Sequence, residues 1–305
     1  VLAYFFGKLL LNEKAGLIAA LLMSIFPMEV VYSTRLGSDL SSAFFMSLGV
    51  YVFLYAEKKL PKYPMYILSG ILIGLAYLVR ESALLIGLFF IAYIIYKRKF
   101  KKEYLLVPAG IILIFCLEFL LFYKLTGDPF FRFQISQKYL TQKTIEHNYF
   151  GRLDFPKGLF HYPYIILTSP LLVFFYLAFF VALIYLIYNK KKETYVLMLW
   201  FLPLLLYLSF GSGSLLQYIP FRAVDRYLSI VTMPGILILA YFLTFDKTKK
   251  KAIMALFIII LAGSSIWASS LYHNKDLKSN LIELYNNIKN FDKPTYIDRK
   301  SFKAL

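Results

Sequence analysis

Residues 104–124 read YLLVPAGIILIFCLEFLLFYK, and this stretch decides the fold class. It holds one carboxylate, Glu118, among apolar side chains. A helix of this length rises about 30 Å, which matches the hydrocarbon core of a bilayer. Similar runs recur along the chain. We expect spans near residues 15–33, 39–56, 65–79, 82–96, 104–124, 164–189, 195–210, 226–245 and 252–272, with residues 1–11 completing another.

The composition supports the same class. Hydrophobic residues make up 60% of the 305 residues and aromatic residues 19%, and the mean hydropathy is +0.64. A soluble domain is only about half apolar. The sequence therefore predicts an all-α polytopic membrane protein in contact with the lipid bilayer. The single cysteine, Cys116, excludes an intramolecular disulfide.

The net charge of +17 gathers in alternate connections between the expected spans. The basic residues are Lys58, Lys59 and Lys62, then Lys97, Arg98, Lys99, Lys101 and Lys102, then Lys190, Lys191 and Lys192, then Lys247, Lys249, Lys250 and Lys251. This is the positive-inside pattern of a multi-pass plasma-membrane protein, so we expect no nucleic-acid partner. Residues 34–38, 80–81, 125–163, 211–225 and those after about 272 are then extracytoplasmic.

Arginines stand beside carboxylates in the short outer connections. The pairs are Arg35 with Asp39, Arg80 with Glu81, and Arg222 and Arg226 with Asp225. Ionisable residues at membrane depth cost about 2.5–3.5 kcal/mol each and persist mainly at functional sites. We interpret these clusters as one substrate-binding surface on the outer face.

Arg35 and Asp39 share a helix face if the following helix begins early, because they are four residues apart. The guanidinium suits a phosphate diester, and the carboxylate is a candidate base or hydroxyl orienter. Alternatively, Ser38 or Asp39 caps the helix that begins near Leu40.

Two further breaks allow two interpretations each. Arg80-Glu81 is either a tight external turn, in which Arg80 holds Glu81, or a broken helix at a cavity. The glycines at 211 and 213 favour a flexible loop over a phosphate cradle. Arg222 and Arg226 are the stronger signal, since the amino end of a helix favours anions.

The outer segment 125–163 is long and aromatic, which favours a functional loop with two short interfacial helices. His147 and His161 lack neighbours at ligand spacing, so we expect interfacial histidines and no metal site. Glu118 either pairs within the bundle or lines a cavity.

Several motifs resemble the membrane core of GT-C class glycosyltransferases, nearest to the protein O-mannosyltransferase and lipid A aminoarabinose transferase group. They are Pro27 to Asp39 with Phe44, Phe45 and Tyr51, then Gly74 to Leu78, then Asp225, Arg226, Tyr227 and Leu228 with Pro234. The resemblance covers residues 1–245. It implies a GT-C-like helical bundle that transfers a sugar, with inversion, from a polyprenyl or dolichyl phosphate to an extracytoplasmic acceptor, without a cofactor.

The resemblance also implies residue roles. Asp39 corresponds to the acidic residue of the second outer motif, and Arg35 to a nearby phosphate or acceptor contact. The principal catalytic carboxylate of the family lies in the first outer loop, which we expect upstream of Val1 in a longer protein. Asp39 is then a supporting residue, while Arg80, Glu81, Arg222, Asp225, Arg226 and Tyr227 are candidate substrate-binding residues.

We expect a transmembrane core over residues 1–272 and the beginning of an extracytoplasmic region over 273–305, with a helix near 277–288 and a strand at Thr295–Asp298. Two other classes remain: a multi-pass transporter or flippase, and a lipid-carrier glycan polymerase or ligase. A transporter would place charges near the midplane and often shows inverted repeats. An acidic residue soon after an upstream first span would favour the transferase over the polymerase.

Overall fold

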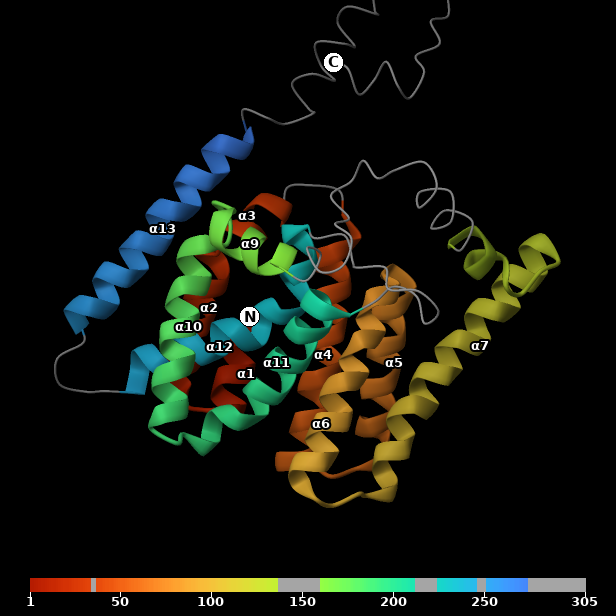
Figure 1. The fold of residues 1–305 in the computed structure, drawn as a ribbon. Coiled ribbons are helices and arrows are strands. Elements are labelled where there is room, and N and C mark those ends of the chain that lie inside the picture. The colour runs from red at the N-terminus through yellow and green to blue at the C-terminus, as the bar shows by residue number, and fades with distance from the viewer. Residues whose placement is uncertain (34–36, 137–159, 212–223, 246–250, 274–305) are drawn as a thin grey trace, which may run out of the picture.

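The computed structural model describes residues 1–33, 37–136, 160–211, 224–245 and 251–273, and all regular elements among them are helices (Figure 1). The expected all-α membrane fold is confirmed. The predicted helix near 277–288 and the strand at 295–298 lie outside the described residues.

In chain order, the α-helices are α1 (Leu2–Leu10), α2 (Glu13–Ile25), α3 (Pro27–Ser33), α4 (Ser38–Lys58), α5 (Tyr63–Val79), α6 (Gly87–Lys97), α7 (Leu106–Thr126), α9 (His161–Thr168), α10 (Val173–Tyr188), α11 (Tyr195–Phe210), α12 (Ser229–Phe245) and α13 (Lys251–His273). Short 3-10 turns are η1 (Glu81–Ile86), η2 (Lys102–Leu105), η5 (Lys192–Thr194) and η6 (Asp225–Leu228).

Two of the expected spans are broken. The span predicted over 15–33 bends by 55° between α2 and α3. Pro27 explains the bend, because the residue before a proline is disfavoured in helical geometry, and Phe26 is extended there (ψ 119°). The span predicted over 164–189 is interrupted between α9 and α10, where Ser169 is also extended. Both breaks lie in the part of the span farther from the lysine-rich connections.

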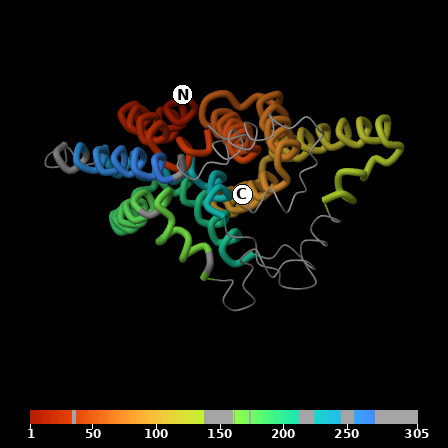
Figure 2. Tube along the Cα trace, turned by 90° about the horizontal axis from the view of Figure 1, so that it is seen from above, coloured from red at the N-terminus to blue at the C-terminus, as the bar shows by residue number. Residues whose placement is uncertain are grey.

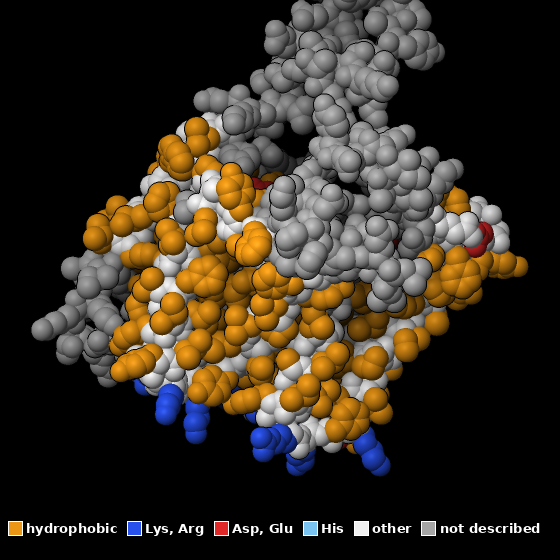
Figure 3. Space-filling model, viewed as in Figure 1, with side chains coloured by type: hydrophobic (Ala, Val, Ile, Leu, Met, Phe, Trp, Pro, Cys, Tyr) orange, Lys and Arg blue, Asp and Glu red, His pale blue; other side chains and the backbone are white. Residues whose placement is uncertain are grey.

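Among the residues that the structure describes, four helices are long and apolar enough to cross a membrane, or five if the bent pair counts as one span. They are α4, η2 with α7, η5 with α11, and η6 with α12. Helices α5, α10 and α13 contain shorter apolar stretches. Hydrophobic side chains cover the flank in Figure 3, and Lys and Arg side chains gather along its lower edge. The basic residues therefore lie at one end of an apolar belt, as the positive-inside pattern requires.

The bundle has α7 on one side and α13 on the opposite side in both views (Figures 1 and 2). Helix α13 packs against α2, α3 and α10, while α5 lies between α4 and α7. Gly70 on α5 and Gly110 on α7 meet so closely that a Cβ atom on Gly70 would overlap the Val107 carbonyl oxygen. Small residues permit this close approach of membrane helices. The contact fixes α7 against α5.

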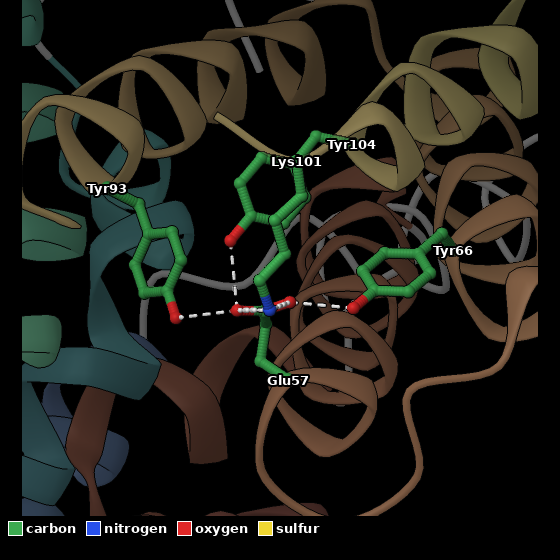
Figure 4. Close-up of polar contacts among 5 residues, drawn as sticks. All are labelled: Glu57, Tyr66, Tyr93, Lys101 and Tyr104. Atoms are coloured by element: carbon green, nitrogen blue, oxygen red, sulfur yellow. Dashed lines mark hydrogen bonds and ion pairs between the residues drawn. The ribbon is translucent and has the colours of Figure 1, made fainter. Parts of the chain in front are cut away.

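The basic end of the bundle holds a buried polar cluster around Glu57, the next to last residue of α4 (Figure 4). Its carboxylate accepts hydrogen bonds from the hydroxyls of Tyr66 at 2.6 Å, Tyr104 at 2.9 Å and Tyr93 at 3.5 Å. Lys101 Nζ lies 2.9 Å and 3.0 Å from its two oxygens. We call these five residues the inner cluster. It joins α4, α5, α6 and η2.

Candidate active site

At the other end of α4, Asp39 brings together three of the outer connections. Its carboxylate is buried, with one oxygen paired to the Arg80 guanidinium and the other 3.6 Å from Nε of Arg226. The helix N-cap is Gly37, which offers no side-chain cap. Asp39 therefore serves as an ion-pair partner in the first turn of α4. We call Asp39, Arg80, Arg226 and Tyr227 the outer cluster.

Arg80 reaches Asp39 because of where α5 ends. Arg80 is the C-cap residue of α5 and has extended geometry, with its amide donating to the Ala76 carbonyl at 2.9 Å. The buried Ser42 hydroxyl of α4 donates to the same carbonyl at 3.0 Å. Ser42 lies one turn beyond Asp39, so the two helix ends are fixed against each other. The break at 80–81 is a short turn that leads from α5 into η1.

Tyr227 supports both arginines of the outer cluster. The Cζ atoms of Arg80 and Arg226 lie 4.3 Å and 5.8 Å from the centre of its ring. Such cation–π contacts orient a guanidinium without using its N–H donors. Burial lowers the pKa of Arg80, and the neighbouring Arg226 charge acts in the same direction. Removing a cation from water beside another cation favours the approach of an anion.

Asp225 has a different environment from Asp39. It accepts hydrogen bonds from the Tyr32 hydroxyl at 2.7 Å and from the Arg226 amide at 2.9 Å. The first bond joins α3 to η6 across 193 residues of sequence. Asp225 thus holds the turn that presents Arg226.

Glu81 faces away from Arg80, contrary to the sequence-based expectation. Its carboxylate lies 3.8 Å from Nε of Arg132 and accepts a hydrogen bond from Ser136 at 3.2 Å. Arg132 also pairs with Glu118 at 2.6 Å, so Glu118 is a paired carboxylate within the bundle. Residues adjacent in sequence therefore have different partners, because the end of α5 lies between the outer cluster and α7.

A cavity of about 340 Å³ is lined by residues that follow Asp39 and Arg226 in the sequence, although no residue of the outer cluster lines it. Leu40 and Ala43 follow Asp39 on α4, and Ser229 and Met233 follow Arg226 along η6 and α12, so the cavity begins within about one turn of both charges. Its walls are mostly apolar, and Glu29 of α3 supplies its one carboxylate. Cations close in sequence to the lining of an apolar cavity suit an amphiphilic anion.

Arg35 and Arg222 lie outside the described residues, as does His147. The described residues contain no group of three His, Cys, Asp or Glu side chains that could hold a metal ion. Arg132 was missed as a site residue by sequence reasoning. The available signal was Glu118, because a lone carboxylate inside a span requires a partner.

Residues 1–122 match the family model of dolichyl-phosphate-mannose-protein mannosyltransferases. The matched stretch includes Asp39, Arg80, Glu81 and Glu118, and it confirms the resemblance for the motifs up to Leu78, whereas the motif from Asp225 to Pro234 lies outside it. It supports a membrane glycosyltransferase that uses a polyprenyl-phosphate sugar. No curated protein and no solved structure matches the chain.

Proposed function

We propose that this protein transfers a sugar from a polyprenyl or dolichyl phosphate to an extracytoplasmic acceptor with inversion at the anomeric carbon, and that the outer cluster binds the donor phosphate. The convergence of Arg80 and Arg226 on the single carboxylate of Asp39 carries the proposal. Two guanidinium groups meet one carboxylate there, so positive charge remains for a bound phosphate. The active face lies opposite the lysines, at the plasma membrane.

The donor fits the site in two parts. Its phosphate would lie against Arg80 and Arg226, and the first isoprene units would enter the adjacent cavity. In this position the acceptor oxygen attacks the anomeric carbon, and the bond from that carbon to the phosphate oxygen breaks. The bond electrons pass to the leaving polyprenyl phosphate, whose growing charge meets preorganised cations. The acceptor proton goes to a base.

Asp39 is a poor candidate for that base, because two guanidinium groups stabilise its ionised form. We assign it the supporting role of holding Arg80 and Arg226 in place. The resemblance implies that a different carboxylate is the principal base. Arg35 and Arg222, in the same outer connections, remain candidates for additional phosphate contacts.

The proposal is tested with the complete protein in proteoliposomes, supplied with polyprenyl-phosphate mannose and acceptor-containing membrane extract. We expect release of polyprenyl phosphate together with sugar transfer. Arg80→Ala and Arg226→Ala should each lower transfer by at least about tenfold, because each removes a charge opposite the developing phosphate. Lysine at either position should restore little activity if the contacts are bidentate.

Lys124→Ala is the matched control, since Lys124 is an exposed cation near the same membrane surface, in the last turn of α7. It should transfer sugar like the unmodified protein. Full activity in both arginine variants at equal membrane abundance would remove the outer cluster from the site. Consumption of a nucleotide sugar in place of the lipid donor would reject the reaction class.

A further inference from the structure

Arg132 occupies a position that the proposed chemistry does not use. It follows α7 in the outer segment, where Asp128 initiates a new turn by accepting a hydrogen bond from the Phe130 amide at 2.8 Å. Its side chain turns back from there toward the bundle and contacts α5, α7 and η1 at once. Arg132 therefore joins three elements close to the outer cluster, and we ask what these contacts do for the cluster.

The contacts of Arg132 use the whole guanidinium. One terminal nitrogen lies 2.6 Å from Oε1 of Glu118, whose side chain is only 4% exposed. The other donates to the Tyr77 carbonyl at 3.1 Å, and Cζ lies 4.9 Å from the centre of the Tyr77 ring. Glu81 approaches Nε at 3.8 Å. Only arginine can make all of these contacts at once, because its planar guanidinium carries several N–H donors and can also lie over an aromatic ring.

The bond to Tyr77 places the cation at the carboxyl end of α5. The last carbonyls of a helix lack intrahelical partners, and a cation near them is favoured by the helix dipole. Arg80 lies three residues after Tyr77, at the C-cap of the same helix. Arg80 points to Asp39 while Glu81 points to Arg132, so the turn is held from both sides.

We propose that Arg132 is a positioning residue for donor binding: it caps α5, anchors the turn at 80–81 to Glu118, and thereby holds Arg80 against Asp39. The inference rests on the proposed function for its effect on donor affinity. Without Arg132, the Tyr77 carbonyl and the buried Glu118 lose their cation, and the end of α5 is free to rearrange. Arg80 would then meet the phosphate in more than one orientation.

Steady-state kinetics of the complete protein in proteoliposomes test this role. Arg132→Ala should raise the KM for polyprenyl-phosphate mannose about fivefold while kcat changes less than about twofold, because the lost interaction positions the ground-state phosphate contact. Arg132→Lys should recover part of the loss, since an ammonium can satisfy Glu118 or the Tyr77 carbonyl. Lys124→Ala, on the preceding helix, should leave both constants unchanged.

A double variant separates positioning from a general loss of structure. If Arg132 acts through Arg80, adding Arg132→Ala to Arg80→Ala should lower the remaining transfer by less than about twofold. Independent, multiplicative losses in the double variant would overturn the inference. So would an unchanged KM in Arg132→Ala.

A measurement without substrate distinguishes this inference from the proposed function. The substitution Ser82→Cys, in a Cys116→Ser background, reports on the turn through the reaction of the new thiol with a membrane-impermeant maleimide. Arg132→Ala should accelerate labelling about threefold by freeing the turn, whereas Lys124→Ala should not. Faster labelling in a protein that ignores the lipid donor would keep the positioning role and reject the donor. Equal labelling rates would reject the positioning role itself.

Discussion

Helix α4 carries a buried carboxylate near each end, Asp39 at the outer face and Glu57 at the basic face. Asp39 pairs with two arginines, whose side chains remain 21% and 42% exposed. Glu57 pairs with one lysine and accepts hydrogen bonds from three tyrosines. The outer cluster therefore has an excess of accessible cations, and the inner cluster is neutral and saturated.

Burial alone does not distinguish a functional charge from a structural one. The useful distinction is whether the surrounding cations have more charge and more N–H donors than the carboxylate can pair with. Nε of Arg226 lies 3.6 Å from Asp39 but makes no hydrogen bond among the described residues, so the carboxylate of Asp39 does not saturate this guanidinium. Both oxygens of Glu57 accept at least two hydrogen bonds each. The outer cluster is open to an anion, whereas the inner cluster joins helices.

The largest expected effect is on cysteine labelling, which reports the orientation of the protein in the membrane. Asp39 and Glu57 should face different compartments, because they lie at opposite ends of α4. Single cysteines in a Cys116→Ser background, treated with a membrane-impermeant maleimide in intact cells, should give an all-or-none result. Sites replacing Gly213 and Asn274 should react, and sites replacing Lys59, Lys99, Lys191 and Lys249 should react only after lysis. A cytoplasmic position for Asn274 would break the assignment of the active face.

The next effect is on stability and belongs to the inner cluster. Glu57→Ala should lower the free energy of unfolding by about 3 kcal/mol, because it leaves Lys101 and three tyrosine hydroxyls without their common acceptor. Thermal unfolding in bicelles measures the loss, and sugar transfer per folded molecule should stay close to normal. A stable but inactive Glu57→Ala protein would show that the inner cluster has a role in activity, and the two clusters would no longer differ in function.

Glu13 supplies the control for this variant. It also meets a lysine and a tyrosine, with Lys8 Nζ at 3.2 Å and the Tyr4 hydroxyl at 2.9 Å. The side chains of Lys8 and Glu13 are 55% and 63% exposed, however, and surface ion pairs contribute little to stability because water screens them. Glu13→Ala should therefore change the unfolding midpoint far less than Glu57→Ala.

The sequence predicted the class of fold because run length and hydropathy are local properties. It also predicted that the basic connections gather at one end of the bundle, since lysines in successive loops follow the positive-inside rule. The bend at Pro27 was missed even though its local cause was visible, because the apolar run continues through it. The break before α10 has the same kind of local cause and was also missed, because Ser169 is extended and precedes Pro170 within an apolar run.

The residues of the outer cluster were found from the sequence, but their pairing was not. Arg80 was assigned to its neighbour Glu81, while the fold directs it to Asp39, 41 positions earlier in the sequence. The inner cluster was missed entirely, because Glu57 adjoins a run of lysines and its tyrosine partners come from three other elements. Side-chain direction at a helix end depends on packing, which no local pattern records.

The smallest expected effect is on donor KM in variants of Tyr227, the aromatic residue of the outer cluster. Tyr227→Leu should raise the donor KM about threefold, since a cation–π contact of this kind contributes about 0.5–1 kcal/mol to holding a guanidinium. Tyr227→Phe keeps the ring beneath Arg80 and should retain most of the affinity. Tyr96→Leu is the control at the basic end, where Lys97 Nζ lies 6.0 Å from the ring, and its donor KM should not change. Equal KM increases in Tyr227→Leu and Tyr96→Leu would mean that ring contacts act through stability alone, and Tyr227 would lose its place in the outer cluster.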